Sequence, residues 1–499
     1  MDIKLQEQSQ SLRTSAAMPL RWYRWWVLWA ALAVVAVLAA PSIWSMVPAY
    51  EDHLGENYQP LRALKFFHSR GTAFHKYGPM NNFLLAPGYG ASLLYWRLIG
   101  QFQSPAEAFP YGFARPLEQL TFLIVQGRIV VLGLSLAMLG LLVMNLRLIT
   151  PRGPLILAGF LLSIGTDYAA AVSFANTRPD GPMLAFCAAA LAVYLRIVYL
   201  GLTPRRALAL SALAVCAISS KELAGPVWVL PYLGLGWAQW QQSRHDPQDR
   251  RRFFQSVSVA LVTGVAGYAL LNIVYAPGTW WQRMQFWLVG VGKDSAVWGG
   301  ELTTPSGSVW GYLGQIGTSL LNNLGPAGSV AAVAAIAAIL MLRPRRWVLL
   351  SLPFLSLMAL GLVPMGYVAD RFYTLAALTL TPMMVAGLTA AWERLAQPRS
   401  RQALAAALGL AVAVNLLWGT FAWHYLDMNW LRVAEREVHA RVEPDTPVYL
   451  LALHRHVPGK SRLEAQGYQL DPRPLQAIVD APADQRPAWV LAEQGQLQF

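Results

Sequence analysis

Residues 25–52 read WWVLWAALAVVAVLAAPSIWSMVPAYED, a long apolar run followed within a few residues by a pair of acids. The apolar part, 25–46, is long enough to cross the roughly 30 Å hydrocarbon core of a bilayer. It predicts a transmembrane helix, and Glu51 and Asp52 are expected just beyond the membrane face. A carboxylate at that depth can act on a polar group carried by a membrane lipid.

The composition of the whole chain is that of a membrane protein. Of its 499 residues, 55% are hydrophobic and 13% are charged, and the mean hydropathy is +0.37. A soluble protein of this size would carry about twice that share of charge. The net charge of +13 does not indicate a nucleic-acid partner, because the arginines lie in short gaps between apolar segments.

About eleven apolar segments are predicted to cross the membrane, so the expected fold class is an all-α polytopic membrane protein. The segments are 25–46, 119–147, 154–170, 181–200, 207–220, 224–239, 255–275, 326–342, 347–364, 372–391 and 403–422. The two cysteines, Cys187 and Cys216, both fall inside predicted spans, so neither a disulfide framework nor a zinc ribbon is expected. The first span resembles a signal peptide but is expected to stay as an anchor.

Arginines collect in or beside alternate gaps between these segments, as the positive-inside rule requires of cytoplasmic loops. They are Arg21, Arg24, Arg147, Arg152, Arg205, Arg206, Arg250, Arg251, Arg252, Arg343, Arg345, Arg346, Arg394, Arg399 and Arg401. The amino terminus is then predicted in the cytoplasm and the carboxyl terminus outside.

Three regions follow from this topology. Residues 1–24 form a cytoplasmic segment, 25–422 form the transmembrane domain with a large outer loop at 48–118, and 423–499 form a small extracytoplasmic domain. Within the outer loop, 58–67 and 84–98 are expected to be short helices lying along the interface.

The carboxyl-terminal region is expected to be a small α/β domain. Its pattern predicts an amphipathic helix at 431–442 and strands at 448–453 and 488–492, and prolines separate these elements.

Six short motifs fall on the same predicted outer side of the membrane or close to it. They are Tyr50-Glu51-Asp52, Lys76-Tyr77-Gly78-Pro79, Arg128, Asn176-Thr177-Arg178-Pro179-Asp180, Ser220-Lys221-Glu222 and Asp370-Arg371-Phe372-Tyr373. Their order and spacing over roughly 20–395 resemble the GT-C superfamily of membrane glycosyltransferases, in particular the family 39-like branch of protein O-mannosyltransferases and aminoarabinose transferases. The Lys-Tyr-Gly-Pro element departs from the His-Pro-Pro form of the mannosyltransferases. The resemblance implies a GT-C fold and a polyprenyl-phosphate sugar as donor.

The chemistry of such a transfer needs one carboxylate. A sugar phosphate carries a stable anionic leaving group, so the acceptor hydroxyl needs a base whereas the leaving group needs no strong acid. Asp52 is the first candidate for the base, Glu51 is the close alternative and Glu56 a distant third, and the resemblance points to the same pair. Alternatively, these acids form a solvated loop face paired with Arg62 or Lys65.

Cations around the departing phosphate would stabilise the transition state. The candidates at the predicted outer face are Lys76, Arg178, Lys221 and Arg371. The residues assigned to substrate binding are Asp180, Glu222, Tyr77 and Tyr373. Alternatively, Arg178 and Asp180 form a local ion pair that caps a helix, and Lys221 and Glu222 extend to the interface from a helix break.

No cofactor is expected beyond the lipid-linked sugar as co-substrate. His53, His68 and His75 match no compact zinc motif, so no metal site is predicted, although the sequence leaves divalent metal dependence open. The absence of a Gly-rich phosphate loop favours a lipid-linked donor over a nucleotide sugar. Most aromatic residues of the outer loops are interpreted as an interfacial belt.

The working hypothesis is an inverting glycosyltransferase of a bacterial inner membrane. It would move a sugar from a polyprenyl-phosphate donor to a hydroxyl or phosphate group of a glycolipid, polysaccharide or protein at the extracytoplasmic face. A secondary transporter or lipid flippase is the alternative, but transporters usually place their coupling groups near the midplane of the membrane. A noncatalytic assembly protein is a third option, and its core would not need converging acids and cations.

Overall fold

The computed structural model describes residues 25–44, 67, 77–105, 112–288, 309–344, 346–365, 370–426, 440–441, 447–451, 469–473 and 489–491. Three predicted site residues, Glu51, Asp52 and Lys76, lie outside these ranges, as do most of the helix expected at 58–67 and of the helix expected at 431–442.

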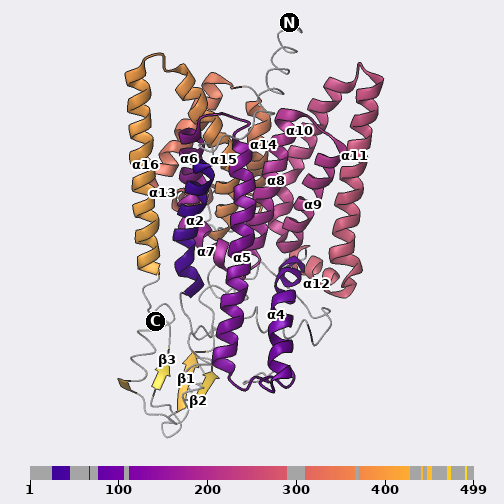
Figure 1. Cartoon of the computed structure of the whole chain (residues 1–499), viewed down its shortest axis with the longest axis vertical. Coiled ribbons are helices and arrows are strands. Elements are labelled where there is room, and N and C mark those ends of the chain that lie inside the picture. The colour runs from indigo at the N-terminus through magenta and orange to yellow at the C-terminus, as the bar shows by residue number, and fades with distance from the viewer. Residues whose placement is uncertain are drawn as a thin grey trace.

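The described chain is built mainly of helices that run side by side in one bundle (Figure 1). The α-helices are α2 (Trp26–Trp44), α4 (Met80–Leu98), α5 (Pro116–Leu146), α6 (Gly153–Phe160), α7 (Tyr168–Ala175), α8 (Asp180–Leu200), α9 (Pro204–Ser220), α10 (Gly225–Ser243), α11 (Pro247–Tyr268), α12 (Pro277–Leu288), α13 (Val309–Leu342), α14 (Trp347–Leu357), α15 (Asp370–Arg394) and α16 (Pro398–Leu426). Short π-helical segments continue three of them, at η2 (Leu161–Gly165), η4 (Ala269–Val274) and η7 (Met358–Leu362), and a 3-10 turn, η3 (Glu222–Ala224), precedes α10.

Each predicted span coincides with a helix or a broken helix, so the expectation of a nearly all-helical, multi-pass membrane fold is confirmed. Seven helices in the described ranges are long and apolar enough to cross a membrane, or eight if the bent pair at 153–165 and 169–175 forms one span. The other predicted spans coincide with α9, α10 and α14, which are shorter or less apolar. The number eleven therefore stays a prediction.

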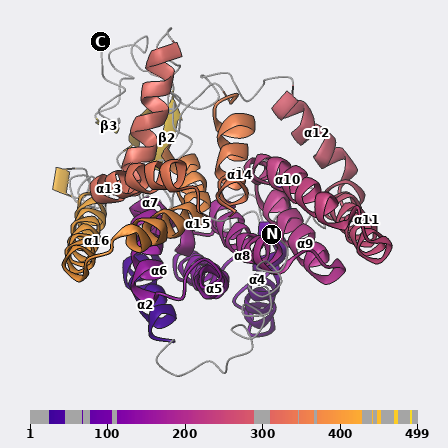
Figure 2. The same cartoon turned by 90° about the horizontal axis from the view of Figure 1, so that it is seen from above.

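The helices differ sharply in how far they are buried. In α8 and α15, 78% and 89% of the most apolar window is buried inside the protein, whereas the values for α11 and α16 are 6% and 11%. Viewed along the bundle, α8 and α15 lie inside, and α11 and α16 lie at the rim (Figure 2). Helices that are apolar on all sides belong at the centre of a bundle, and rim helices present apolar side chains to lipid.

The arginine-rich turns lie at the end of the bundle opposite to the polar motifs. The turns between α10 and α11 and between α15 and α16 lie at the top of Figure 1, and α11 carries the Arg250-Arg251-Arg252 run close to its start. The beginning of α8 and the end of α9 lie at the other end, which we call the site end. Which end faces the cytoplasm stays a prediction.

Helix α4 corrects the expectation for 84–98. It does not lie flat but stands beside the lower part of α5, beyond most of the other helices (Figure 1). The reason is a stripe of buried residues at helical spacing, Leu85, Tyr89, Leu93 and Trp96, which packs in one cluster with residues of α5 such as Leu123.

Three short strands of the carboxyl-terminal region form a parallel sheet at the site end, in the order β2-β1-β3. β1 (Pro447–Leu451) and β3 (Trp489–Leu491) coincide with the two predicted strands, whereas β2 (Gln469–Arg473) was not predicted. Pro472 lies inside β2, and proline in a strand is tolerated at a sheet edge, which is the position β2 occupies. The α/β character of a whole 423–499 domain stays a prediction.

Helix α13 is broken at Gly325, where the backbone takes a positive φ of 69° before Pro326. The side chain of Asn415 on α16 compensates for the break. Its Oδ1 accepts hydrogen bonds from the backbone N–H groups of Ala327 and Gly328, both at 3.1 Å, and its Nδ2 donates to the carbonyl of Leu324 at 2.7 Å. Backbone groups freed inside apolar surroundings need such partners.

We therefore expect Asn415→Leu to destabilise the protein by about 1–3 kcal/mol, because the backbone groups around the break lose their partner while buried. Thermal unfolding in lipid nanodiscs, followed by tryptophan fluorescence, measures this. Gln402→Leu, an exposed position on the same helix, is the control. Equal melting of both variants would mean that Asn415 does not support the break.

Candidate functional site

The centre of the site is an ion pair between two helix ends. Asp180 is the first residue of α8, and Lys221 directly follows α9. Lys221 Nζ lies 2.5 Å from Asp180 Oδ1, and only 3% of the lysine side chain and 9% of the aspartate side chain are exposed. Both charges are therefore held inside the protein at the site end.

Local sequence explains why the two helices end there. Asn176 Oδ1 accepts a hydrogen bond from the N–H of Arg178 at 2.8 Å, and Pro179 then leads into α8. Lys221 has an extended backbone, with φ −155° and ψ 128°, and Pro226 lies in the first turn of α10. The positive end of the α8 dipole favours a carboxylate at Asp180.

Other predicted residues surround this pair. Lys221 Nζ lies 4.4 Å from the centre of the Phe372 ring and 5.4 Å from that of the Tyr77 ring. The guanidinium carbon of Arg371 lies 5.4 Å from the same Phe372 ring. Arg178 and Arg371 both interact electrostatically with Asp180 and Lys221. The fold thus brings together Tyr77, Arg178, Asp180, Lys221 and Arg371, which the sequence placed on four separate motifs.

Arg283 on α12 extends this cluster, and the sequence analysis missed it. Its Nη1 donates to the carbonyl of Tyr77 at 3.0 Å and its Nη2 to Asn272 Oδ1 at 2.9 Å. Its Nε lies 3.4 Å from Glu222 Oε1. The residue is 2% exposed. The available signal was that Arg283 is the lone charged residue of the Trp-rich segment PGTWWQRMQFWL.

The amide of Asn272 continues this network to α9, because its Nδ2 donates to Ser219 Oγ at 2.8 Å. Asn272 belongs to the π-helical segment η4, and Ser219 lies two residues before Lys221. Arg283 therefore connects the backbone of Tyr77, the residue after Lys76, to the segment 221–224 between α9 and α10, which holds Lys221. We call this segment the break.

The part of the outer loop just before α4 packs against the end of α9. A Cβ atom at Gly78 would lie 2.0 Å from the backbone oxygen of Ser219, so this contact requires glycine. Asn81, near the start of α4, donates from Nδ2 to the carbonyl of Thr177 at 2.8 Å. The loop is thus fixed to both segments that carry the ion pair.

Burial and charge set the electrostatics of the break. Burial lowers the pKa of Lys221 to about 8, although the Asp180 carboxylate opposes this change. Burial also raises the pKa of the Glu222 carboxyl above its usual range, against the effect of Arg283. An anion placed next to Lys221 would favour its charged form. With Arg178, Arg371 and Arg283, cations outnumber carboxylates among the described residues of the cluster, so it can bind an anion.

The remaining predicted residues stand as follows. Glu51, Asp52 and Lys76 lie outside the described residues, although Tyr77 directly follows Lys76. Glu222 pairs with Arg283. Tyr373 is 1% exposed and belongs to the main core cluster, so its substrate contact stays a prediction.

The alternative for Lys221 does not fit the geometry, whereas Asp180 keeps its place at the start of α8 and its electrostatic interaction with Arg178. Lys221 turns inward to Asp180 and does not extend to the interface. Asp180 pairs with Lys221 from another helix, so its ion pair is not confined to Arg178 nearby in the chain.

Arg128, which was one of the six motifs, connects α5 to the end of α2. It is buried on α5 and its Nη1 donates to the carbonyl of Ile43 at 3.1 Å, near the end of α2. This contact holds the helix end from which the chain leads toward Glu51 and Asp52. Within the described ranges, no group of three or more His, Cys, Asp or Glu side chains could hold a metal ion.

No protein-family model and no curated protein matches the chain. Among solved structures, ArnT from Cupriavidus metallidurans bound to undecaprenyl phosphate is similar, with a TM-score of 0.53 and 13% identity over 88% of this chain and 85% of that one. The Archaeoglobus fulgidus oligosaccharyltransferase tethered to an acceptor peptide gives 0.48 and 11% identity, covering 91% and 64% of the two chains.

The S. cerevisiae protein O-mannosyltransferase Pmt1-Pmt2 complex bound to the sugar donor gives a TM-score of 0.39 and 16% identity. The matched part is 55% of this chain and 36% of that one. The similarity to ArnT confirms the fold that the motifs implied.

The Asp180–Lys221 pair yields a direct test by double substitution. Asp180→Asn leaves a buried ammonium without its counter-charge, so we expect a loss of about 3–5 kcal/mol in stability. Adding Lys221→Met should recover most of the loss, because no unpaired charge then remains in the pair. Thermal unfolding in nanodiscs measures both variants.

Glu393→Gln is the control, because Glu393 pairs with Arg152 at 2.9 Å on the exposed surface and should cost no more than about 1 kcal/mol. A double variant as unstable as Asp180→Asn would show that the two charges are not coupled.

Proposed function

We propose that this protein is an inverting glycosyltransferase that moves a sugar from a polyprenyl-phosphate donor to an acceptor at the extracytoplasmic face of a bacterial inner membrane. The observation that carries the proposal is the cation-rich cluster around Lys221, built at the ends of membrane helices. The GT-C fold shared with ArnT, a protein solved bound to undecaprenyl phosphate, supports a lipid-linked donor.

The donor phosphate would bind among Lys76, Arg178, Lys221 and Arg371, and Arg283 joins this set. Arginine can bind phosphate through two parallel N–H donors, whereas lysine acts as a point charge. Negative charge grows on the phosphate as the glycosidic bond breaks, so preorganised cations stabilise the transition state more than the bound donor. The carboxylates of Asp180 and Glu222 keep Lys221 and Arg283 in position before the donor arrives.

The reaction is a single displacement. The acceptor oxygen attacks the anomeric carbon from the face opposite the phosphate, and its proton passes to the carboxylate of Asp52 or Glu51. The bond between the anomeric carbon and the phosphate oxygen breaks, and its electron pair leaves with the polyprenyl phosphate. The configuration at the anomeric carbon inverts. Polar groups of Asp180 and Glu222 and the rings of Tyr77 and Tyr373 are proposed to contact the sugar.

The wider assignment follows the same proposal. Residues 25–422 form the transferase core with the outer loop 48–118, and 423–499 form a periplasmic domain on the acceptor side. The acceptor belongs to the glycolipids, polysaccharides or proteins of the cell envelope. The polyprenyl-phosphate sugar is the co-substrate, and no cofactor is assigned.

The catalytic base is tested by amide substitutions at the two acids. Asp52→Asn should reduce sugar transfer by at least about 10²-fold because general base catalysis is lost, and Glu51→Gln should reduce it less. Transfer of radiolabelled sugar from polyprenyl-phosphate donors in membranes measures this. Asp249→Asn, an exposed acid at the start of α11, is the control. Full activity in both acid variants would remove this pair from catalysis.

The contact of the first outer loop with α9 yields a second test. Gly78→Ala places a Cβ atom against the backbone of Ser219, so the loop must move and carry Lys76 with it. Because a displacement of about 1 Å can cost roughly 10²-fold in rate, we expect transfer to fall strongly with little change in melting temperature. Gly88→Ala on α4 is the control, since its nearest neighbour is the flexible Gln126 side chain at 3.4 Å. Equal rates in the two variants would contradict the role of this contact.

A further inference from the structure

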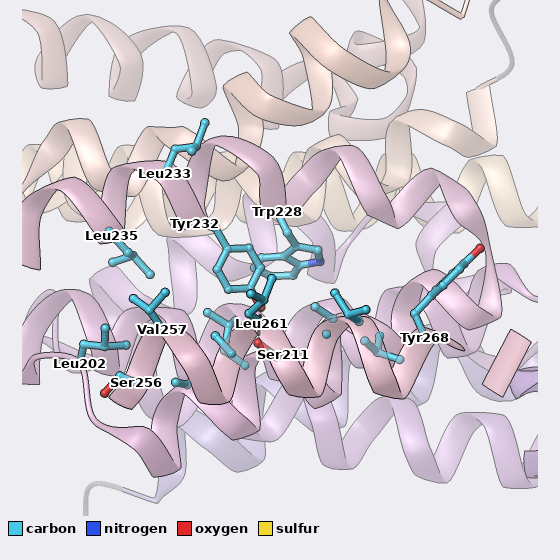
Figure 3. A pocket seen from close by; sticks show the side chains of 18 of the residues that line it. Leu202, Ser211, Trp228, Tyr232, Leu233, Leu235, Ser256, Val257, Leu261 and Tyr268 are labelled. Atoms are coloured by element: carbon cyan, nitrogen blue, oxygen red, sulfur yellow. Dashed lines mark hydrogen bonds between the residues drawn. The ribbon is translucent and has the colours of Figure 1, made fainter. Parts of the chain in front are cut away.

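A large apolar cavity lies between α9, α10 and α11 and borders the polar cluster at one end. Its volume is about 940 Å³. The lining extends along the helices from Leu202 and Leu235 at one end, past Trp228, to Tyr268 at the other (Figure 3). The cavity therefore runs parallel to the spans over much of their length.

The hydroxyl groups in the lining are already bonded. Ser211 Oγ and Tyr232 OH share a hydrogen bond of 2.8 Å, and Ser256 Oγ donates to the carbonyl of Arg252 at 2.8 Å. Tyr268 OH accepts from Trp280 Nε1 at 3.2 Å. A polar ligand would find little to bind, so the walls suit a hydrocarbon. The indole N–H of Trp228, which has no partner among the described residues, lies in the half toward Tyr268.

The Tyr268 end of the cavity adjoins the candidate site. The lining residues Ile218 and Ile273 are direct sequence neighbours of Ser219 and Asn272, which bond to one another and, through Asn272, to Arg283. A molecule with an anionic head among the cations could thus place its apolar chain between the three helices.

The membrane side of the cavity is open to lipid. Helix α11 is the least buried of the candidate spans, and its Leu261 and Val265 line the cavity while remaining 64% and 63% exposed. An apolar space of this size in a bilayer is filled by hydrocarbon, because an empty one forfeits the contacts of its walls. Small residues such as Ala214, Gly236 and Gly264 leave recesses that methyl branches can occupy.

We propose that this cavity binds the polyisoprenoid chain of the carrier lipid and makes affinity depend on the length of that chain. The inference rests on the proposed function for the identity of the head group. The phosphate lies among the cations at the site end, the first isoprene units pass Ile218 and Ile273, and later units extend toward Leu202. A short chain contacts only the walls beside Ile218 and Ile273 and gains nothing from the walls toward Leu202.

The test uses sugar-free lipid phosphates, so it does not depend on sugar transfer. Binding of undecaprenyl phosphate and of the short-chain farnesyl phosphate to the full-length protein is measured in phosphatidylcholine nanodiscs. Gly264→Leu is the test variant, because an added Cβ at this lining residue meets nothing within 4 Å and the side chain can occupy the cavity without a clash. Gly409→Leu on α16, equally open but away from the cavity, is the control.

We expect the intact protein and Gly409→Leu to bind the long chain at least about tenfold more tightly than the short one. Gly264→Leu should abolish most of this difference and leave farnesyl phosphate binding unchanged. Equal affinity of the intact protein for both chains, or an unchanged difference in Gly264→Leu, would overturn the proposal.

Photo-crosslinking identifies the occupant. Undecaprenyl phosphate with a diazirine in its chain should label peptides of α9, α10 and α11, and unlabelled undecaprenyl phosphate should compete. Labelling of the same peptides by a diazirine phospholipid that undecaprenyl phosphate does not displace would assign the cavity to a membrane phospholipid and overturn the proposal. Chain-length-dependent binding without sugar transfer from any donor would support the cavity and contradict the proposed function.

Discussion

The buried pair of Asp180 and Lys221 is the constraint around which the site end is organised. An unpaired charge at this depth would be costly, so α8 must begin and α9 must end where the two groups can meet. Tyr77 and Phe372 then place their rings over the lysine from two further elements. The pair holds the Lys221 ammonium at a fixed point, and Arg178 and Arg371 add positive charge around it.

Interrupted helices make such a site possible in a bilayer. A continuous helix satisfies its own backbone hydrogen bonds, whereas a break frees backbone groups that need partners. Asn415 supplies them at the break of α13, and the π-helical segment η4 carries Asn272 toward Ser219. Each break is thus stabilised by a polar side chain from a neighbouring element or contributes one to the network.

Arg283 links parts of the chain that would otherwise be independent. Through Tyr77, Asn272 and Glu222 it joins the first outer loop, the end of α11 and the segment before α10. A change in the position of α12 would therefore alter the positions of the outer loop beside Lys76 and of the segment that holds Lys221. The polar cluster and the apolar cavity share this border, where Ile218 and Ile273 adjoin the network.

The sequence by itself determined the membrane class and the approximate position of each long helix. It also singled out Asp180, Lys221 and Arg371, because charges beside long apolar runs are costly unless the fold accommodates them. It did not reveal Arg283, the upright position of α4 or the strand containing Pro472. Those features depend on partners distant in the chain: an arginine among tryptophans looks like an interfacial residue until Tyr77 and Glu222 lie beside it. Which charges meet was decided by packing, because only the assembled bundle brings the ends of α8, α9 and α15 together.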